Sequence, residues 1–341
     1  MHRNLILILF ILLIISPVSA EIKAYWPGFD NSISTSDVMD ITNGPEGSVV
    51  FATSNGLCVF SKDSWTIFHS KAIDKRGYLQ GIPLNDFVKC AEYDNSNNLW
   101  LGFSSGLQIY DGYTTPVTIR DSDKILSGCS INDLQSLGEQ MWIATGNTGV
   151  YCYQNGEWKW FKPYSGSGLT ATKISDMAVD YSTGTLVLAS QNEGQYILLN
   201  DDSNNPHFKK IDDKSLSPDM REVRSGNKGG VYFFNRTDIA YYNRADGAVH
   251  VLNVKELSDF AYSISDLSLT KDGRLIIGTN FGLFAWKEGI ITESLSTKDL
   301  ISSQIKKVFV DSHGRWWFTN KYYAGYYTKP EFSPVISIEI A

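Results

Sequence analysis

The 341-residue chain carries 30 Lys and Arg residues against 37 Asp and Glu residues, and 13% of its residues are aromatic. A formal net charge of −7 without a Lys/Arg cluster argues against a nucleic-acid-binding protein. The aromatic content favours pleated, half-buried β-strands, and the length is sufficient for one large domain.

The first 20 residues, MHRNLILILFILLIISPVSA, have the pattern of a secretory signal peptide. Arg3 provides a positive start, Leu5–Ile15 an apolar run, and Val18–Ala20 small residues at a cleavage site. The apolar run is shorter than the about 20 residues that span a bilayer, which argues against an uncleaved anchor. We therefore predict cleavage before Glu21 and a periplasmic or extracellular protein with no membrane span after cleavage.

One pattern occurs seven times along the chain: an apolar segment, a small residue, a short turn and a second apolar segment, as in Leu99–Tyr110. This pattern predicts two antiparallel strands joined by a tight turn. The turn positions are 43 to 50 residues apart and are Gly56, Gly106, Gly149, Gly194, Asp238, Gly282 and Gly325. A period in this range is typical of a solenoid or propeller, in which each unit packs against the next.

A further strand is predicted before each hairpin and another after it. The preceding strands start at Val38, Phe87, Ile131, Ile174, Met220, Ile264 and Ile305, and clear following strands start at Trp65, Glu157 and Ala248. Four antiparallel strands per unit, without helical periodicity, predict an all-β protein: a seven-bladed β-propeller over residues 21–330. Six blades would result if the copy with Asp238 were only a linker.

The segment Ala24–Phe29 resembles the fourth strands but has no hairpin before it. Because a propeller must close its ring, we predict that this segment is the outer strand of the blade that holds Trp316 and Trp317. The tail from Pro334, within residues 331–341, is an alternative strand for that edge.

The repeats resemble the two-component regulator propeller family, whose blades read V-x-x-I and then D-x-x-G-x-L-W-I-G-T-x-x-G-L-x-x-Y. The matching segments are Ile264–Leu267 with Asp272–Leu283, Leu99–Gly102 with Gly106–Leu107, and Met141–Thr145. The resemblance covers nearly all of residues 24–330. It implies the periplasmic sensor part of a hybrid two-component regulator, often tuned to glycans. Residues 331–341 resemble the entry into the immunoglobulin-like domain of that family. Since that domain and the kinase do not follow, two predictions stay open, a truncated sensor and a stand-alone secreted propeller.

Catalytic and metal-binding motifs were not found. The mature chain has four separated histidines, His69, His207, His250 and His313, and no nucleophile or phosphate-loop motif. We therefore predict no enzyme activity, no cofactor and no metal. The spacings of the four cysteines, Cys58, Cys90, Cys129 and Cys152, match no zinc motif. We interpret them as small core residues, and one disulfide bond among them is an alternative.

The third position of the inner strand carries a charge in every repeat. The residues are Asp40, Lys89, Asp133, Asp176, Glu222, Asp266 and Lys307. Around a closed ring they predict a polar collar in the central channel. The collar is read as a structural ring of hydrogen bonds and solvated charges, with an ion site as the alternative.

Ligand contacts are predicted on the face formed by two sets of loops, those between strands two and three and those that lead into the inner strands. Sugar rings favour aromatic platforms with amide and guanidinium donors at their edges. The candidate residues are Arg76, Tyr78, Asn147, Asn192, Arg236, Phe281, Tyr322 and Tyr323. The alternative for each is an ordinary solvent-facing loop residue.

The sequence thus favours an exported, sensor-type binding propeller whose ligand is a small molecule or oligosaccharide, most simply a carbohydrate. The alternatives are a polysaccharide lyase or hydrolase on a propeller scaffold, which predicts paired acid and base groups, and a protein-interaction scaffold, which predicts a broad apolar patch. A homodimer and a separate sensor-kinase partner are both left open.

Overall fold

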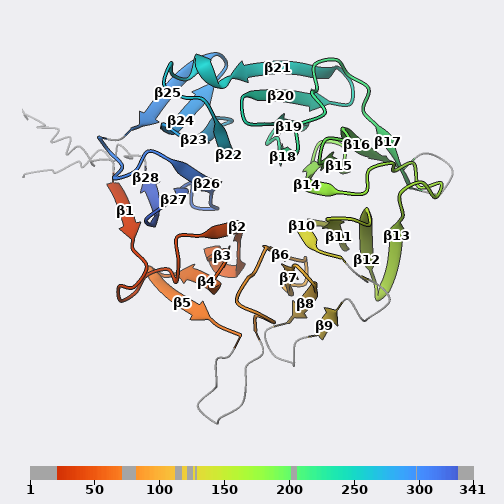
Figure 1. Ribbon diagram of the computed structural model, residues 1–341, viewed down its shortest axis with the longest axis horizontal. Helices are drawn as coiled ribbons and strands as arrows, with labels where there is room; N and C mark the ends of the chain where they lie inside the picture. The colour runs from red at the N-terminus through yellow and green to blue at the C-terminus, as the bar shows by residue number, and fades with distance from the viewer. Residues whose placement is uncertain are drawn as a thin grey trace, which may run out of the picture.

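The computed structural model describes residues 21–70, 82–111, 117–120, 126, 129–200, 206–296 and 298–328, without the side chains of 117–120. These residues form seven four-stranded antiparallel sheets, arranged around a common axis (Figure 1). We number the sheets as blades 1 to 7 from the blade that contains β2. The seven-bladed propeller predicted from the repeats is confirmed, and the copy with Asp238 is a complete blade 5.

The strands occupy equivalent positions in every blade. The innermost strands are β2 (Val38–Asn43), β6 (Cys90–Tyr93), β10 (Ile131–Leu137), β14 (Ile174–Asp180), β18 (Glu222–Ser225), β22 (Ile264–Leu269) and β26 (Ile305–Val310). The second strands are β3 (Val49–Thr53), β7 (Leu99–Phe103), β11 (Gln140–Thr145), β15 (Thr185–Ser190), β19 (Val231–Phe234), β23 (Leu275–Thr279) and β27 (Trp316–Asn320).

The third and outer strands complete the blades. The third strands are β4 (Gly56–Ser61), β8 (Gly106–Tyr110), β12 (Val150–Gln154), β16 (Gln195–Leu199), β20 (Asp238–Asn243), β24 (Gly282–Lys287) and β28 (Ala324–Thr328). The outer strands are β5 (Ser64–Phe68), β9 (Val117–Arg120), β13 (Glu157–Phe161), β17 (His207–Lys210), β21 (Gly247–Asn253), β25 (Ile290–Leu295) and β1 (Glu21–Tyr25). Two short 3-10 helices are η1 (Pro45–Gly47) and η2 (Val254–Glu256).

The hydrophobic core lies between neighbouring blades. Every residue of the second strands β3, β7, β15, β23 and β27 is buried, because both faces of these strands pack against other sheets. Small residues permit this close approach: a Cβ atom on Gly102 would lie 2.6 Å from Ile131 Cγ2 of the next blade. A Cβ on Gly278 would likewise lie 2.6 Å from Val308 Cγ2. At these two glycines, the close approach of the next blade explains the small residue that follows the first apolar segment of the repeat.

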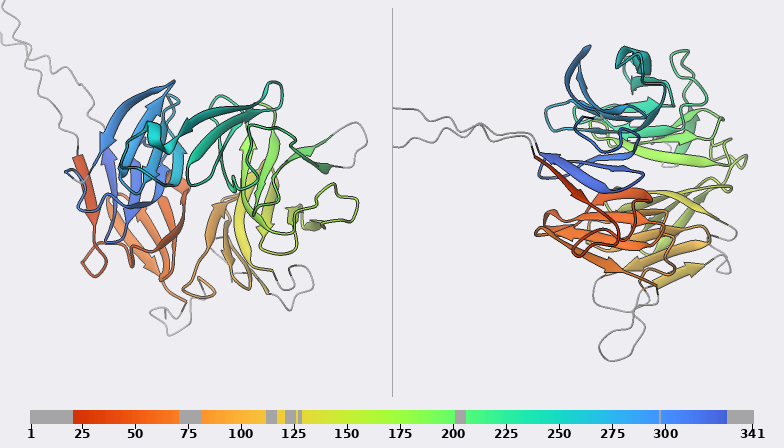
Figure 2. Two further views of the ribbon diagram at one scale, coloured as in Figure 1. Left: turned by 45° about the horizontal axis from the view of Figure 1, so that its top comes forward. Right: turned by 60° about the vertical axis from the view of Figure 1, so that its left-hand side comes forward.

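The N-terminal strand closes the ring. β1 pairs antiparallel with β28 and forms the outer edge of blade 7, as Figures 1 and 2 show from several directions. The Tyr25 ring packs 5.3 Å from the Trp65 ring of blade 1 and 6.3 Å from that of Trp317. The predicted partner blade is therefore correct, but the strand runs over Glu21–Tyr25 rather than Ala24–Phe29. The alternative tail from Pro334 lies outside the described residues.

Blade 7 departs from the repeat at its central turn. In blade 6 the last residue of the second strand, Thr279, pairs with Gly282. In blade 7 the last residue of the second strand is Asn320, and its backbone N–H donates to the carbonyl oxygen of Tyr323, so Tyr323 takes the position of Gly282. Gly325 lies two residues further along, inside β28, where a Cβ would meet the Lys23 carbonyl oxygen at 2.5 Å. The prediction that Gly325 marks this turn is therefore wrong.

All four cysteines are buried, and none is in a disulfide. Cys58 and Cys152 lie in the third strands β4 and β12 of blades 1 and 3. Burial raises the pKa of the Cys152 thiol to about 12. The interpretation of the cysteines as small core residues is confirmed.

Candidate functional site

The two sets of loops named in the sequence analysis lie on one face of the ring, because antiparallel strands two and three turn at the end where the inner strand begins. Of the predicted residues, Asn147 and Asn192 lie in such turns on blades 3 and 4, where both are exposed. Arg236, Phe281 and Tyr322 lie in the turns of blades 5, 6 and 7. Arg76 and Tyr78 lie outside the described residues.

Tyr323 is a correction to the predicted site. Its side chain is only 2% exposed, and its ring lies 4.8 Å from the Trp26 ring and 5.8 Å from the Phe318 ring. Tyr323 occupies the position of the turn glycine, so its side chain turns into the core of blade 7. It supports the turn and makes no contact on the loop face.

A cavity of about 630 Å³ opens on this face over blades 5 to 7, and we call it the mouth pocket. It is lined by Arg221, Glu222, Phe234, Asn235, Arg236, Ser263, Ile264, Ser265, Asn280, Gln304, Ile305, Lys306 and Lys321. Of the predicted residues, Arg236 lines the cavity directly. Phe281 and Tyr322 each follow a lining residue, Asn280 and Lys321, in the chain.

The blade 6 side of the mouth pocket is held by one amide side chain. Asn280 Oδ1 accepts hydrogen bonds from the backbone N–H groups of Tyr262 and Ser263 at 2.8 and 2.9 Å. Its Nδ2 donates to the carbonyl oxygen of Phe260 at 3.3 Å. These bonds tie the loop into β22 to the turn between β23 and β24, so the blade 6 rim is preorganised.

Exposed aromatic side chains stand in the same loops as residues that line the mouth pocket, without lining the cavity themselves. Phe260 and Tyr262 are 72% and 65% exposed, and the rings of Phe260 and Phe281 lie 5.3 Å apart. Tyr322 is 47% exposed, with Lys321 Nζ 5.5 Å from the centre of its ring. The sequence analysis missed Phe260 and Tyr262, although both stand in the loop into an inner strand, which it had named as a functional loop set.

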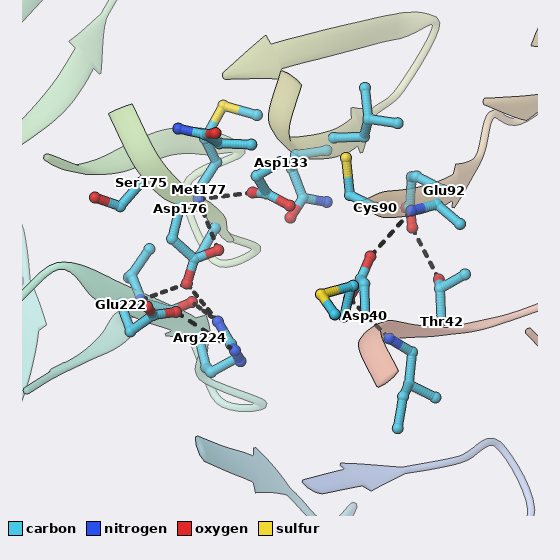
Figure 3. A pocket seen from close by; sticks show the side chains of 18 of the residues that line it. Asp40, Thr42, Cys90, Glu92, Asp133, Ser175, Asp176, Met177, Glu222 and Arg224 are labelled. Carbon is cyan, nitrogen blue, oxygen red and sulfur yellow. Dashed lines mark hydrogen bonds and ion pairs between the residues drawn. The ribbon is translucent and has the colours of Figure 1, made fainter. Parts of the chain in front are cut away.

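A second cavity, of about 310 Å³, lies deeper in the central channel, and Glu222 lines both cavities. Figure 3 shows acidic and basic side chains of several blades around it. Asp40 accepts hydrogen bonds from the backbone N–H of its neighbour Ile41 and from that of Ala91 in blade 2. The other aspartates of the collar make the same bond to the next blade: Asp133 to Met177, Asp176 to Val223 and Asp266 to Val308.

The collar therefore joins neighbouring blades through charged acceptors, which supports its interpretation as a structural ring. In five blades a β-bulge lies immediately before the collar position, for example between Val38 and Asp40. Among the described residues, no group of three or more His, Cys, Asp or Glu side chains has a geometry that could hold a metal ion.

The collar differs from the prediction in blade 2. Cys90 pairs with Gly102 just as Asp40 pairs with Ala52, so Cys90 occupies the collar position and Lys89 precedes it by one residue. Lys89 Nζ instead donates to Ser130 Oγ and Asn132 Oδ1 of blade 3, both at 2.7 Å. The prediction was wrong by one residue because it counted the inner strand of blade 2 from Phe87, whereas the register makes Val88 the equivalent of Val38.

Arg224 is the charged residue of the channel that the sequence analysis missed. It lies two positions after the collar residue Glu222, and its guanidinium donates to Asp176 and, at 2.7 Å, to Asp266 Oδ1. It thereby links blades 4, 5 and 6 and also lies 5.4 Å from the centre of the Phe234 ring. Phe234 pairs with Glu222 as Gly278 pairs with Asp266, so a bulky side chain stands here where blade 6 has a glycine. Phe234 is buried between Arg224 and the mouth pocket.

Several carboxyl groups of the channel have pKa values above their ordinary range. Burial raises the pKa of Glu92 to about 7, against the hydrogen bond that Thr42 Oγ1 donates at 2.9 Å. Burial and the Asp176 carboxylate raise the pKa of Glu222 to about 7. Burial, followed by Asp176 and Asp40, also raises the pKa of Asp133. The channel thus keeps fewer negative charges at pH 7 than its carboxyls would carry in water.

No family model and no curated protein sequence matches the chain. Solved structures do match. The extracellular domains of two hybrid two-component systems from B. thetaiotaomicron align with 17% identity and TM-scores of 0.70 and 0.64, over 92% and 90% of this chain. The chain covers 41% and 40% of those domains, so it spans about two fifths of their length.

A streptogramin B lyase also matches, with 12% identity, a TM-score of 0.66 and coverage of 91% of this chain and 97% of the lyase. At these identities the likeness shows the fold. In the part of the chain that the structure describes, no helix is long and apolar enough to cross a membrane. In fold, the protein is therefore similar to the extracellular propellers of two-component sensors and to a propeller lyase alike.

Proposed function

We propose that the protein is an exported, sensor-type binding propeller and that its ligand is a carbohydrate held at the mouth pocket. The observation that carries this proposal is the combination of a 630 Å³ cavity with exposed aromatic rings and polar side chains on one face. A cavity of this size falls within the range of sites for small ligands.

The chemistry of the rim suits a sugar. The apolar faces of Tyr262, Phe281 and Tyr322 offer stacking surfaces, since aromatic rings present an apolar face and, in Tyr, a polar tip. Ser263 supplies a hydroxyl group. The side-chain oxygens of Asn280 and Asn235 already accept hydrogen bonds from backbone N–H groups, and each amide keeps one N–H that can pair with a sugar hydroxyl. Because Asn280 already fixes its loops, these groups are ordered before a ligand arrives.

Export and a sensor role are part of the same proposal. The first 20 residues have a signal-peptide pattern, and two of the similar structures are extracellular domains of two-component systems. By analogy with those domains, we propose that ligand recognition at the mouth pocket is the sensing step of this protein.

The test is a thermal-shift screen of the chain from Glu21 against an oligosaccharide panel, with product analysis of each well. A ligand at about 100 times its Kd adds about 2.7 kcal/mol to the free energy of unfolding, which raises the unfolding midpoint measurably. We expect at least one sugar to give a shift and to be recovered intact.

Two variants place the site. Tyr322→Ala should abolish the shift, whereas Tyr181→Ala, which removes an exposed tyrosine from the turn between β14 and β15 on the opposite face, should leave it unchanged. A shift with cleaved sugar would replace the binding module with the enzyme alternative, for which the lyase provides a precedent in fold. The absence of any shift across the panel would reject the carbohydrate proposal.

A further inference from the structure

We propose that the mouth pocket binds an acidic oligosaccharide, one that carries carboxylate or sulfate groups, and that Arg221 and Arg236 recognise those groups. This inference rests on the proposed function and adds the chemical class of the sugar.

The charge of the pocket is opposite to that of the chain. Its lining contains four basic side chains and one acidic one, although the whole chain has a formal net charge of −7. The basic residues are Arg221, Arg236, Lys306 and Lys321, and the acidic residue is Glu222. A concave site with one sign of charge raises the local concentration of ions of the opposite sign.

The two guanidinium groups are available to a ligand. Within the described ranges, the side chains of Arg221 and Arg236 have no hydrogen bond or ion pair, and both residues are exposed. Lys306 Nζ has a carboxylate partner, Asp37, at 3.4 Å. A guanidinium presents a planar fork of donors that matches carboxylate and sulfate oxygens, so these two arginines are the specific anion contacts.

The acidic groups near the pocket offset only part of the charge of its four cations. Asp219, beside the lining residue Asn235, accepts hydrogen bonds from Ser217 and Asn235, which lower its pKa and keep it charged. Glu222 lies 4.0 Å from Arg224, and burial raises its pKa to about 7, so it is only partly charged near neutral pH. The net charge of the mouth pocket therefore remains positive.

The cations lie on two sides of a neutral blade. Arg221 and Arg236 belong to blade 5, and Lys306 and Lys321 belong to blade 7. Between them, blade 6 contributes the uncharged Ser263, Ser265 and Asn280. A ligand that spans this cavity would place hydroxyl groups over blade 6 and negative groups at either end. An oligosaccharide with more than one acidic group has this pattern, whereas a neutral sugar would leave the positive charge of the guanidinium groups uncompensated.

The experiment measures affinity by titration calorimetry with two matched pairs of sugars. The first pair is trigalacturonate and its fully methyl-esterified form, which keeps the rings and loses the charge. The second pair is a sulfated galactan trisaccharide and its desulfated form. We expect at least one charged sugar to bind about tenfold or more tightly than its uncharged partner, and the pair that responds identifies carboxylate or sulfate as the recognised group.

Variants connect the charge preference to the arginines. Arg221→Ala and Arg236→Ala should each weaken binding of the charged sugar about tenfold, because each removes a charged hydrogen-bond donor. Arg244→Ala is the matched control, since Arg244 is exposed in the turn between β20 and β21, away from the mouth pocket. Affinity for the charged sugar should also fall as the salt concentration rises.

Each result has a separate meaning. Equal affinity for charged and uncharged sugars, unchanged in both arginine variants, would overturn the acidic class and leave the carbohydrate function intact. Failure of all four sugars to bind, together with failure of the wider neutral panel, would overturn both proposals. A charge preference that persists in both arginine variants would place the anion site elsewhere and reject the mouth pocket.

Discussion

The collar of the channel and the mouth pocket are built from adjacent positions of the same inner strands, but they treat charge in opposite ways. Arg221 directly precedes Glu222, and Lys306 directly precedes Lys307. In the collar, aspartates accept backbone hydrogen bonds from the next blade, and Arg224 joins two of them. In the mouth pocket, two arginines have no partner among the described residues. The charged side chains of the collar are bonded to neighbouring blades and stabilise the ring, whereas the two arginines of the mouth pocket remain available to a ligand.

The largest difference in the free energy of unfolding between the two regions should appear when Arg224 of the channel is replaced. Arg224→Met leaves the carboxylates of Asp176 and Asp266 buried without their shared cation, and breaking a buried ion pair in this way costs about 3–5 kcal/mol. Urea unfolding should show this loss of stability. Arg221→Met is the matched control and should change little; equal losses in the two variants would mean that the two regions are not distinct.

Glu92 should make the stability of the channel depend on pH. Its pKa is about 7 in the folded chain and near 4.5 when unfolded, so between these values the folded state holds a proton that the unfolded state has lost. The stability that Glu92 contributes is therefore complete below pH 4.5 and is lost as the pH rises through about 7.

Glu92→Gln should accordingly stabilise the protein by about 1–3 kcal/mol at pH 8 and have almost no effect at pH 4. Glutamine keeps an oxygen that accepts from Thr42. The check is urea unfolding of both proteins at the two pH values. An equal effect at pH 4 and pH 8 would show that packing, and not the charge, explains the change.

The mouth arginines should contribute little to stability. Arg221→Ala and Arg236→Ala should each change the free energy of unfolding by less than about 0.5 kcal/mol, because they are exposed side chains without partners. The same urea titrations test this expectation. A loss of more than about 1 kcal/mol would show that the arginines are structural and would remove the contrast with Arg224.

The smallest effect is expected at the cysteines. Burial raises the pKa of Cys90 in the collar well above its ordinary value and also raises that of Cys58. A thiol reagent at pH 8 should therefore label no cysteine in the folded protein and all four after unfolding. The unfolding midpoint should be unchanged by a reductant, since none of the four is in a disulfide. A reductant-dependent midpoint would contradict this arrangement.

The sequence predicted the collar in outline but not its bonds. Asp40, Asp133, Asp176 and Asp266 recur at one position of the repeat, so their ring follows from the sequence alone. The donors to these carboxylates, the backbone N–H groups of the next blade, belong to another repeat 42 to 51 residues away. Cys90, and not Lys89, occupies the collar position of blade 2. This depends on strand register, because a shift of one residue moves every side chain of a strand to the opposite face.

The candidate site was predicted unevenly for the same reason. Arg236, Phe281 and Tyr322 lie in turns that the repeat identifies, and all three stand at or beside the mouth pocket. Tyr323 stands in the same turn, but one residue further on its side chain points into the core. Phe260 and Tyr262 belong to a longer loop without a repeated pattern, so their place at the rim depends on their hydrogen bonds to Asn280.

By itself the sequence determined the repeat period, the inner strand and hairpin of each repeat and the blade that the N-terminal strand completes, because these features follow from local patterns of apolar residues and turns. The structure showed that the copy with Asp238 is a seventh complete blade and located the outer strand of every blade. Only the tertiary structure decided which charges are paired and which remain available. Arg221 and Arg224 are the same residue type three positions apart in one segment. One contacts the carboxylates of two other blades and the other faces an open cavity, a difference made entirely by neighbours that are distant in the chain.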